Sequence, residues 1–165
     1  MSIENLEITA VAIDHLNKEI NQRAGNSILF VPDNWPSEEK EYAYPSTVES
    51  VTKLLKQNKV PVDSLHPIDA TTPLHDNRGL DWIAPTFLVS GLLLTQNPMV
   101  VSIVLGIVAN YVTDLFKGLK NDPKVKLNIV QTAADGKRAQ RIKYEGPVSG
   151  LPEVEKVLSA FETKE

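Results

Sequence analysis

The side-chain types best suited to chemistry gather in one segment, residues 66–81, which holds two histidines and three aspartates. Neutral imidazoles and carboxylates are common ligands of divalent cations and common acid–base catalysts. The histidines lack the helical spacing of an HExxH motif, however, and aspartates in loops commonly form turns. A small metal-dependent or acid–base enzyme that uses this His66–Asp81 loop is therefore the alternative prediction. Its candidate catalytic residues are His66, Asp69, His75 and Asp76, with Asp81 nearby, and the candidate metal ligands are His66, His75 and Asp76.

Other chemistry-bearing motifs are absent from the sequence. It has no P-loop, no GxGxxG, no nucleophile elbow and no cysteine, so thiolate chemistry and disulfides are excluded. Asp33 follows a predicted strand, where α/β folds often place functional groups, but no glycine-rich loop accompanies it. A basic ribbon is most simply a solvated strand face, with an acidic partner or lipid headgroups as the alternative. We expect no cofactor. The ribbon consists of Lys137, Arg138, Arg141 and Lys143.

Length and composition indicate one globular domain that spans residues 1–165. The chain is 42% hydrophobic and 23% charged, which is ordinary for a folded protein of this size. Its net charge of −4 gives no reason to expect binding to nucleic acid. The N-terminal residues contain early acidic side chains and no basic region of a signal peptide, and cysteine is absent. We therefore expect a cytoplasmic protein.

The N-terminal half is predicted to contain a βαβ-like unit. Residues 2–22 favour an amphipathic helix, with a strand through 6–13 as the competing interpretation because that piece also alternates. The apolar run 27–33 predicts a buried strand, and residues 47–58 predict a helix that Ser46 caps. A second strand within 59–69 would then pair in parallel with the first.

The C-terminal part is predicted to be a β-hairpin followed by a closing helix. Two alternating runs in residues 124–146 flank Asp135-Gly136, the strongest turn signal in the chain. Residues 151–162 carry apolar side chains at helical spacing. Together with the N-terminal half, these elements predict an α+β fold.

Between the two parts lies an apolar stretch, residues 83–113, without one charged residue or histidine. Asn97-Pro98 divides it, since asparagine favours the N-cap of a helix and proline its first turn. The second segment ends at Gly118, a residue type that commonly ends helices. We therefore predict a central apolar helical hairpin at about 83–117, with a shorter first arm over about 85–95.

The longer arm carries a stripe of small or polar residues at four-residue spacing, and such stripes let helices approach closely. Thr86, Ser90 and Gly91 of the shorter arm are the residues expected to face it. The candidate interaction residues are the stripe, Ser102, Gly106, Asn110 and Asp114, and the apolar side chains Val101, Ile103, Leu105, Val108 and Phe116.

Three interpretations of the hairpin remain open: a buried core, a surface covered by a partner or sister subunit, and membrane insertion. The function we predict is non-catalytic. The protein would be an interaction or oligomerising protein whose hairpin packs against a protein partner or a second copy. Release from a resting assembly, followed by entry into a membrane as an effector, is a conditional form of this prediction.

Overall fold

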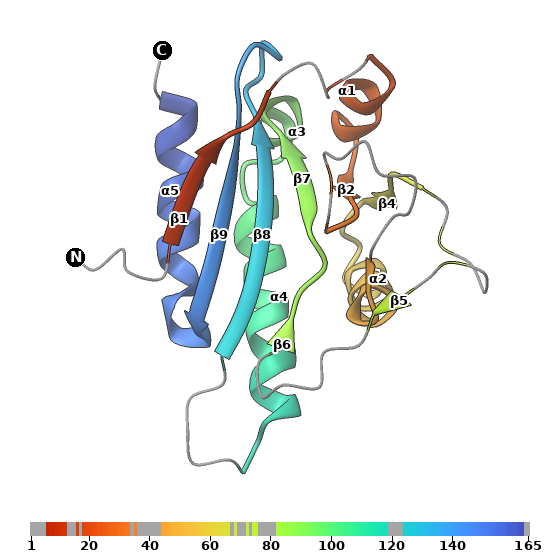
Figure 1. Ribbon diagram of the computed structural model, residues 1–165, viewed down its shortest axis with the longest axis vertical. Helices are drawn as coiled ribbons and strands as arrows, with labels where there is room; N and C mark the ends of the chain where they lie inside the picture. Colours follow the sequence, from red (N-terminus) through yellow and green to blue (C-terminus); the bar gives the residue numbers. More distant parts are fainter. Residues whose placement is uncertain are drawn as a thin grey trace.

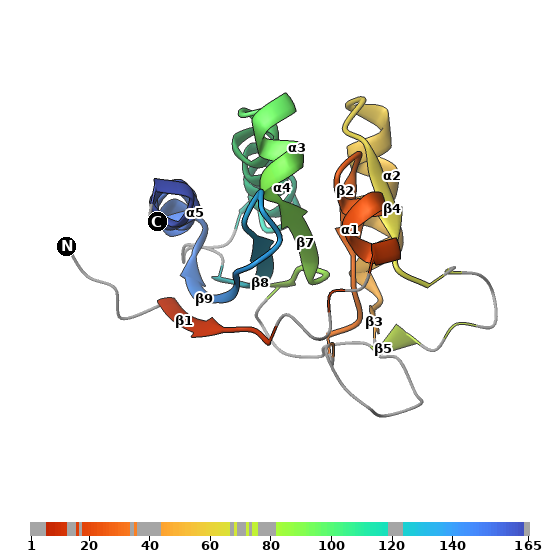
Figure 2. The ribbon, with the colours of Figure 1, turned by 90° about the horizontal axis from the view of Figure 1, so that it is seen from above.

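The computed structural model shows an α+β fold, as predicted, in which α3, α4 and α5 lie on one side of β7, β8 and β9 (Figures 1 and 2). The helices are α1 (Lys18–Ala24), α2 (Thr47–Gln57), α3 (Gly91–Gln96), α4 (Val100–Leu115) and α5 (Leu151–Thr163), with a 3-10 turn, η2 (Val148–Gly150). The structure describes residues 6–12, 16, 18–33, 35, 44–66, 68, 72, 74–75, 82–118 and 124–163.

Most described strands belong to one mixed sheet with the order β1-β9-β8-β7-β2-β4, and β6 pairs with β8 beside this path. A small second sheet joins β3 to β5 in parallel. The strands are β1 (Leu6–Ala10), β2 (Ile28–Phe30), β3 (Tyr44–Pro45), β4 (Val62–Ser64), β5 (Leu74–His75), β6 (Trp82–Ile83), β7 (Phe87–Ser90), β8 (Lys124–Thr132) and β9 (Ala139–Pro147).

Two predicted units are present. β2 and β4 pair in parallel and α2 connects them, which is the predicted βαβ arrangement. β8 and β9 pair antiparallel along their whole length, and Gly136 in their turn has the positive φ of 71° that glycine adopts readily. α5 follows and closes the fold. α2 has apolar residues at helical spacing and the hairpin strands alternate, so the local sequence pattern of each agrees with its observed structure.

The predicted N-terminal helix over residues 2–22 is wrong where the structure describes it. Residues 6–10 form β1, which pairs antiparallel with β9, and the helix begins only at Lys18. The alternation of Leu6, Ile8 and Ala10 with polar residues fits a strand, and the long β9 supplies an edge for it. Tertiary pairing therefore decided between two local patterns that the sequence left open.

The first arm of the predicted helical hairpin is also wrong. Residues 87–90 form β7, which lies between β2 and β8, and only the six residues of α3 are helical before Asn97. All four β7 residues are buried, and an apolar run without period 2 does not distinguish such a strand from a buried helix. The second arm is confirmed as α4, which ends near Gly118 with its positive φ of 96°.

Alternating side chains of the sheet build two cores on its opposite faces. On β7, Val89 points into the larger core with α2, α4 and α5, whereas Leu88 points into the smaller core with α1. On β8, Ile129 and Val130 divide in the same way. The sheet is thus covered by helices on both faces near β7 and β2.

We predict opposite effects for two glycine-to-alanine substitutions. A Cβ on Gly91 would overlap the backbone nitrogen of Ala134, whereas a Cβ on Gly106 would meet no atom within 4 Å. Gly91→Ala should lower the free energy of unfolding by about 1–3 kcal/mol through overpacking. Gly106→Ala should raise it by about 0.5–1 kcal/mol because alanine favours the helix. Urea unfolding measures both, and shifts of the same sign would contradict this placement.

Candidate functional site

The predicted polar loop is described only in part. Asp69, Asp76 and Asp81 lie outside the described residues, and His75 is described only as a backbone member of β5, opposite Pro45 of β3. Within the described part of the chain, no group of three histidine, cysteine or acidic residues is placed to hold a metal ion. The metal or acid–base site at His66–Asp81 therefore stays a prediction.

His66 lies at the end of β4 in a partly buried position beside Arg23. Its backbone N–H donates to the Tyr44 hydroxyl at 3.4 Å. Burial, and secondarily the positive charge of Arg23, lower the pKa of the His66 imidazole from its usual value of 6.5. The neutral form of His66 therefore prevails at neutral pH.

Arg23 itself joins α1 to β4. Its guanidinium donates to the Asp63 carboxylate at 2.8 Å, to the carbonyl of Leu65 at 3.0 Å and to the carbonyl of Ser64. These bonds satisfy carbonyls at the end of an edge strand. The observed role of Arg23 is thus to hold α1 against the sheet.

Asp33 and Arg141 tie the segment after β2 to the neighbouring strands. Asp33 accepts a hydrogen bond from the Thr86 hydroxyl at 2.8 Å, and Arg141 donates to the carbonyl of Trp35. Burial lowers the pKa of Arg141, and the Asp33 carboxylate opposes this effect. The sequence identified both residue types as functional candidates, but the contacts that the structure gives them are structural.

The predicted basic ribbon is divided between different environments. The guanidinium of Arg138 lies 4.6 Å from the centre of the Phe161 ring, in a cation–π contact with α5. Arg141 is held at Trp35, while Lys137 and Lys143 are exposed. These cations therefore do not form one continuous surface.

The stripe on α4 faces solvent. Ser102 is partly buried, and Gly106, Asn110 and Asp114 are exposed. The expected packing of the first arm against this stripe is wrong, because the three residues expected to do so belong to β7 or border it. Thr86, Ser90 and Gly91 are buried, and Ser90 donates to the carbonyl of Ala24 at 2.7 Å.

The predicted apolar interaction residues divide between core and surface. Val101, Leu105 and Val108 are buried in the larger core, and Phe116 packs partly against it. Ile103 is 44% exposed on the outer face of α4. Within this chain, only part of the predicted set is free to contact another molecule.

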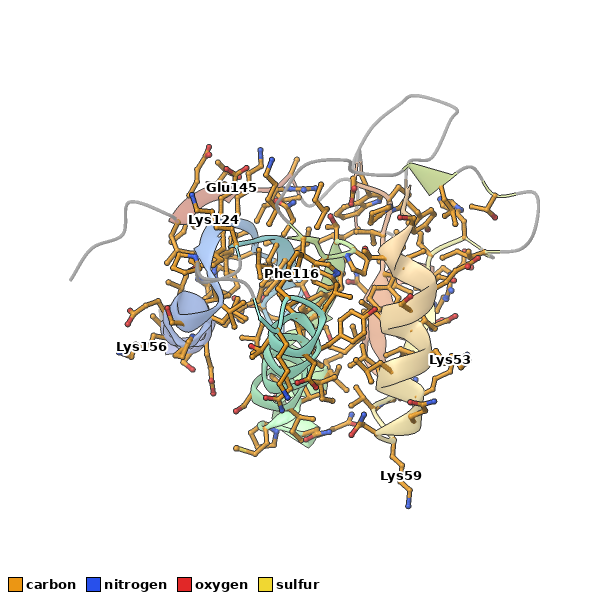
Figure 3. All side chains as sticks on the ribbon, turned by 90° about the horizontal axis from the view of Figure 1, so that it is seen from below. Lys53, Lys59, Phe116, Lys124, Glu145 and Lys156 are labelled. Atoms are coloured by element: carbon orange, nitrogen blue, oxygen red, sulfur yellow. The ribbon has the colours of Figure 1, made fainter. Side chains whose placement is uncertain are left out.

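The outer side of α4 combines exposed apolar side chains with small and polar ones. Met99 at the start of α4 is 59% exposed and Leu115 at its end 54%, and α4 carries no charge before Asp114. Figure 3 shows that lysines point outward from the flanking helices, Lys53 from α2 and Lys156 from α5. We call the following residues the α4 face, of which Ser102 is partly buried and the others are exposed: Met99, Ser102, Ile103, Gly106, Asn110, Thr113 and Asp114.

A groove of about 390 Å³ runs beside the α4 face, between α4 and α5. Ser102, Gly106 and Ala109 line it from α4, and Leu151 and Pro152 line it from α5. A second hollow of about 270 Å³ lies between the start of α4 and α5, and Glu155 lines both. Small side chains on α4 therefore leave space into which a side chain of another molecule would fit.

Another hollow, of about 420 Å³, lies between α2 and β4. Its charged lining comes from exposed side chains of both signs, so it has no net preference for an anion or a cation. The charged residues are Glu49, Lys53, Lys56 and Asp63.

Comparisons with known proteins add no relative to this description. No family model, no curated protein and no solved structure matches the chain. Among the described residues, no helix is both long enough and apolar enough to span a membrane. The α4 face and its groove are the candidate functional site on geometry alone.

We predict that acid destabilises the folded protein partly through His66. Because its pKa in the folded state lies below 6.5, the unfolded chain binds this proton first as the pH falls. The contribution of neutral His66 to the free energy of unfolding is therefore present above pH 6.5, and it is lost as the pH falls toward the folded-state pKa. Between about pH 7.5 and about pH 5.5, urea unfolding of His66→Gln should show a smaller loss than the unsubstituted protein. An imidazole NMR titration of His66 at or above 6.5 would contradict the prediction.

Proposed function

We propose that this protein is a non-catalytic, self-associating interaction protein, and that the α4 face is its contact surface. The observation that carries the proposal is the outer face of a 16-residue helix that has no charge before Asp114 and on which Met99 and Ile103, one turn apart, are about half exposed. Contiguous exposed apolar surface on a soluble domain commonly marks an interface. The proposal requires neither a cofactor nor nucleic acid, and it assumes a cytoplasmic protein.

A second copy is the occupant that the side chains favour. At Gly106 no side chain separates the α4 backbone from a partner, so two α4 helices would cross closely there. The absence of charge before Asp114 removes like-charge repulsion between two identical faces, although the whole chain carries −4. An isologous contact around a twofold axis follows from this self-complementarity.

The groove between α4 and α5 would let side chains of one subunit insert into the other. The exposed side chains of Met99 and Ile103 would enter the groove of the other subunit, where Ser102, Gly106 and Ala109 are small and Leu105 adds an apolar wall. Burial of apolar side chains in a pocket of this kind supplies the central energy of most interfaces. Glu155 lies in the lining and would remain at the rim, where a charge is tolerated.

We predict that Ile103→Glu weakens self-association at least tenfold, equivalent to about 1.4 kcal/mol, because it buries a charge at the contact. Light scattering over a concentration series measures this effect against the 18.2 kDa mass of one chain. Gly106→Leu should also weaken association, since it fills the crossing point while meeting no atom of its own chain at Cβ.

Gln57→Glu is the matched control, because it adds the same charge at an exposed position on α2. It should leave the mass unchanged at every concentration. An unsubstituted protein that stays at 18.2 kDa, or an Ile103→Glu protein with unaltered association, would overturn the proposal. Flotation with vesicles of mixed neutral and anionic phospholipid that depends on Ile103 would assign the α4 face to a lipid surface instead.

A further inference from the structure

β1 forms an open edge of the main sheet (Figure 1). Of the described strands, only β9 pairs with it. Its residues are exposed apart from the partly buried Leu6, and Ile8 is 51% exposed. An edge strand of this kind presents unpaired backbone groups to any strand that can align with it. This edge lies on a different element from the α4 face.

The pairing with β9 fixes which backbone groups of β1 face outward. The N–H of Val11 donates to the carbonyl of Ala139 at 3.0 Å, and the same register sets Thr9 opposite Arg141. In an antiparallel ladder, hydrogen-bonded and non-hydrogen-bonded pairs alternate. The odd-numbered residues therefore bond to β9, and the N–H and C=O groups that point to the open edge belong to Leu6, Ile8 and Ala10.

We infer that β1 pairs antiparallel with β1 of a second copy of this chain, around a twofold axis at Ile8. In this register Ile8 lies opposite the partner subunit's Ile8, and Leu6 lies opposite the partner subunit's Ala10. Each outward-facing residue then exchanges backbone hydrogen bonds with an outward-facing residue of the partner. The two sheets become one continuous sheet through a β-augmentation contact.

The side chains of β1 suit pairing with an identical strand. The twofold register sets Glu7 opposite the partner subunit's Thr9, so the two Glu7 carboxylates are not directly opposed. Ile8 projects on the same face of the sheet as Leu6, which packs partly against the larger core. The exposed half of the Ile8 side chain would be buried against the same residue of the partner.

The other end of the main sheet is less suited to such pairing. β4 has three residues, and Asp63 within it is bridged to Arg23 of α1 at 2.8 Å. Short length and an engaged charge are common devices that protect a sheet edge from pairing. β1 is longer, and its one charged residue, Glu7, bonds to β9 through its backbone and is offset from its own copy in the proposed register, which is why we assign the contact to this edge.

The contact between the two β1 strands is small, so we expect weak association. A five-residue strand is about 17 Å long, and its pairing buries less than the roughly 800 Å² per partner of a standard interface. We expect dissociation in the micromolar range. The inference does not depend on the α4 face, and it is tested on the Ile103→Glu background so that the two contacts are separated.

Amide hydrogen exchange at single residues is the test. On dilution from roughly 500 to roughly 5 µM, exchange of the Ile8 amide should accelerate several-fold, up to the roughly tenfold limit that mass action sets for a dimer, because no described strand of its own chain pairs with this side of β1. The Thr9 amide bonds to β9 within the chain and should stay protected at both concentrations. Equal behaviour of the two amides, or fast exchange of Ile8 at every concentration, would overturn the inference.

Substitutions at Ile8 give an independent readout. Ile8→Pro removes an outward-facing N–H, which an edge strand tolerates, and should give the monomer mass at all concentrations. Ile8→Val keeps the N–H and should retain the dimer. Should Ile8→Pro fail to fold, Ile8→Lys sets two like charges across the axis and should also give the monomer. A dimer that persists in the folded Ile8→Pro or Ile8→Lys protein would contradict the pairing.

Discussion

The fold depends on the burial of β7 on both of its faces. Phe87 and Val89 extend into the larger core and Leu88 into the smaller one, and all four residues of the strand are buried. β7 also pairs antiparallel with β2 and parallel with β8, so it joins the βαβ unit to the C-terminal hairpin. A charged side chain on either face would be removed from water, which explains why this segment is uncharged and why its one polar residue, Ser90, is hydrogen-bonded within the fold.

The end of β7 sets the path of the helices that follow. The Ser90 hydroxyl donates to the carbonyl of Ala24 and accepts from the N–H of Leu93, so one side chain fixes α1 and caps α3. Gly91 then passes so close to Ala134 that a Cβ would overlap it. These contacts direct α4 along the sheet with Val104 and Val108 inward and Gly106 outward.

Elements with one clear period were predictable from the sequence. The stripe of Val48, Val51 and Leu55 indicated α2, and alternation around Asp135-Gly136 indicated the C-terminal hairpin, because each pattern fits one local structure. β7 and β1 were not predictable in this way. A short apolar run is compatible with a strand or a helix, and pairing with β8 or β9 decides between them.

The sequence predicted which residues share the candidate face of α4, but not whether that face points to the core or to solvent. Four-residue spacing identified Ser102 and Gly106 as one face of a helix, yet spacing alone does not say whether that face meets the core or solvent. Tertiary packing turned the valine-rich side inward and left the stripe outward. Likewise, Asp33 and Arg141 were suitable residue types for a site, but only the structure shows that they hold a loop.

The proposed contacts use two features of the described surface, the α4 face and the β1 edge. At the other end of the main sheet, the Asp63 carboxylate of β4 is bridged to Arg23 at 2.8 Å, which protects that edge. The α4 face has no charge before Asp114, and β1 carries one charged residue, Glu7, among its five residues. Exposed apolar side chains on helices and open strand edges favour aggregation, and the two contacts that we propose would cover both features.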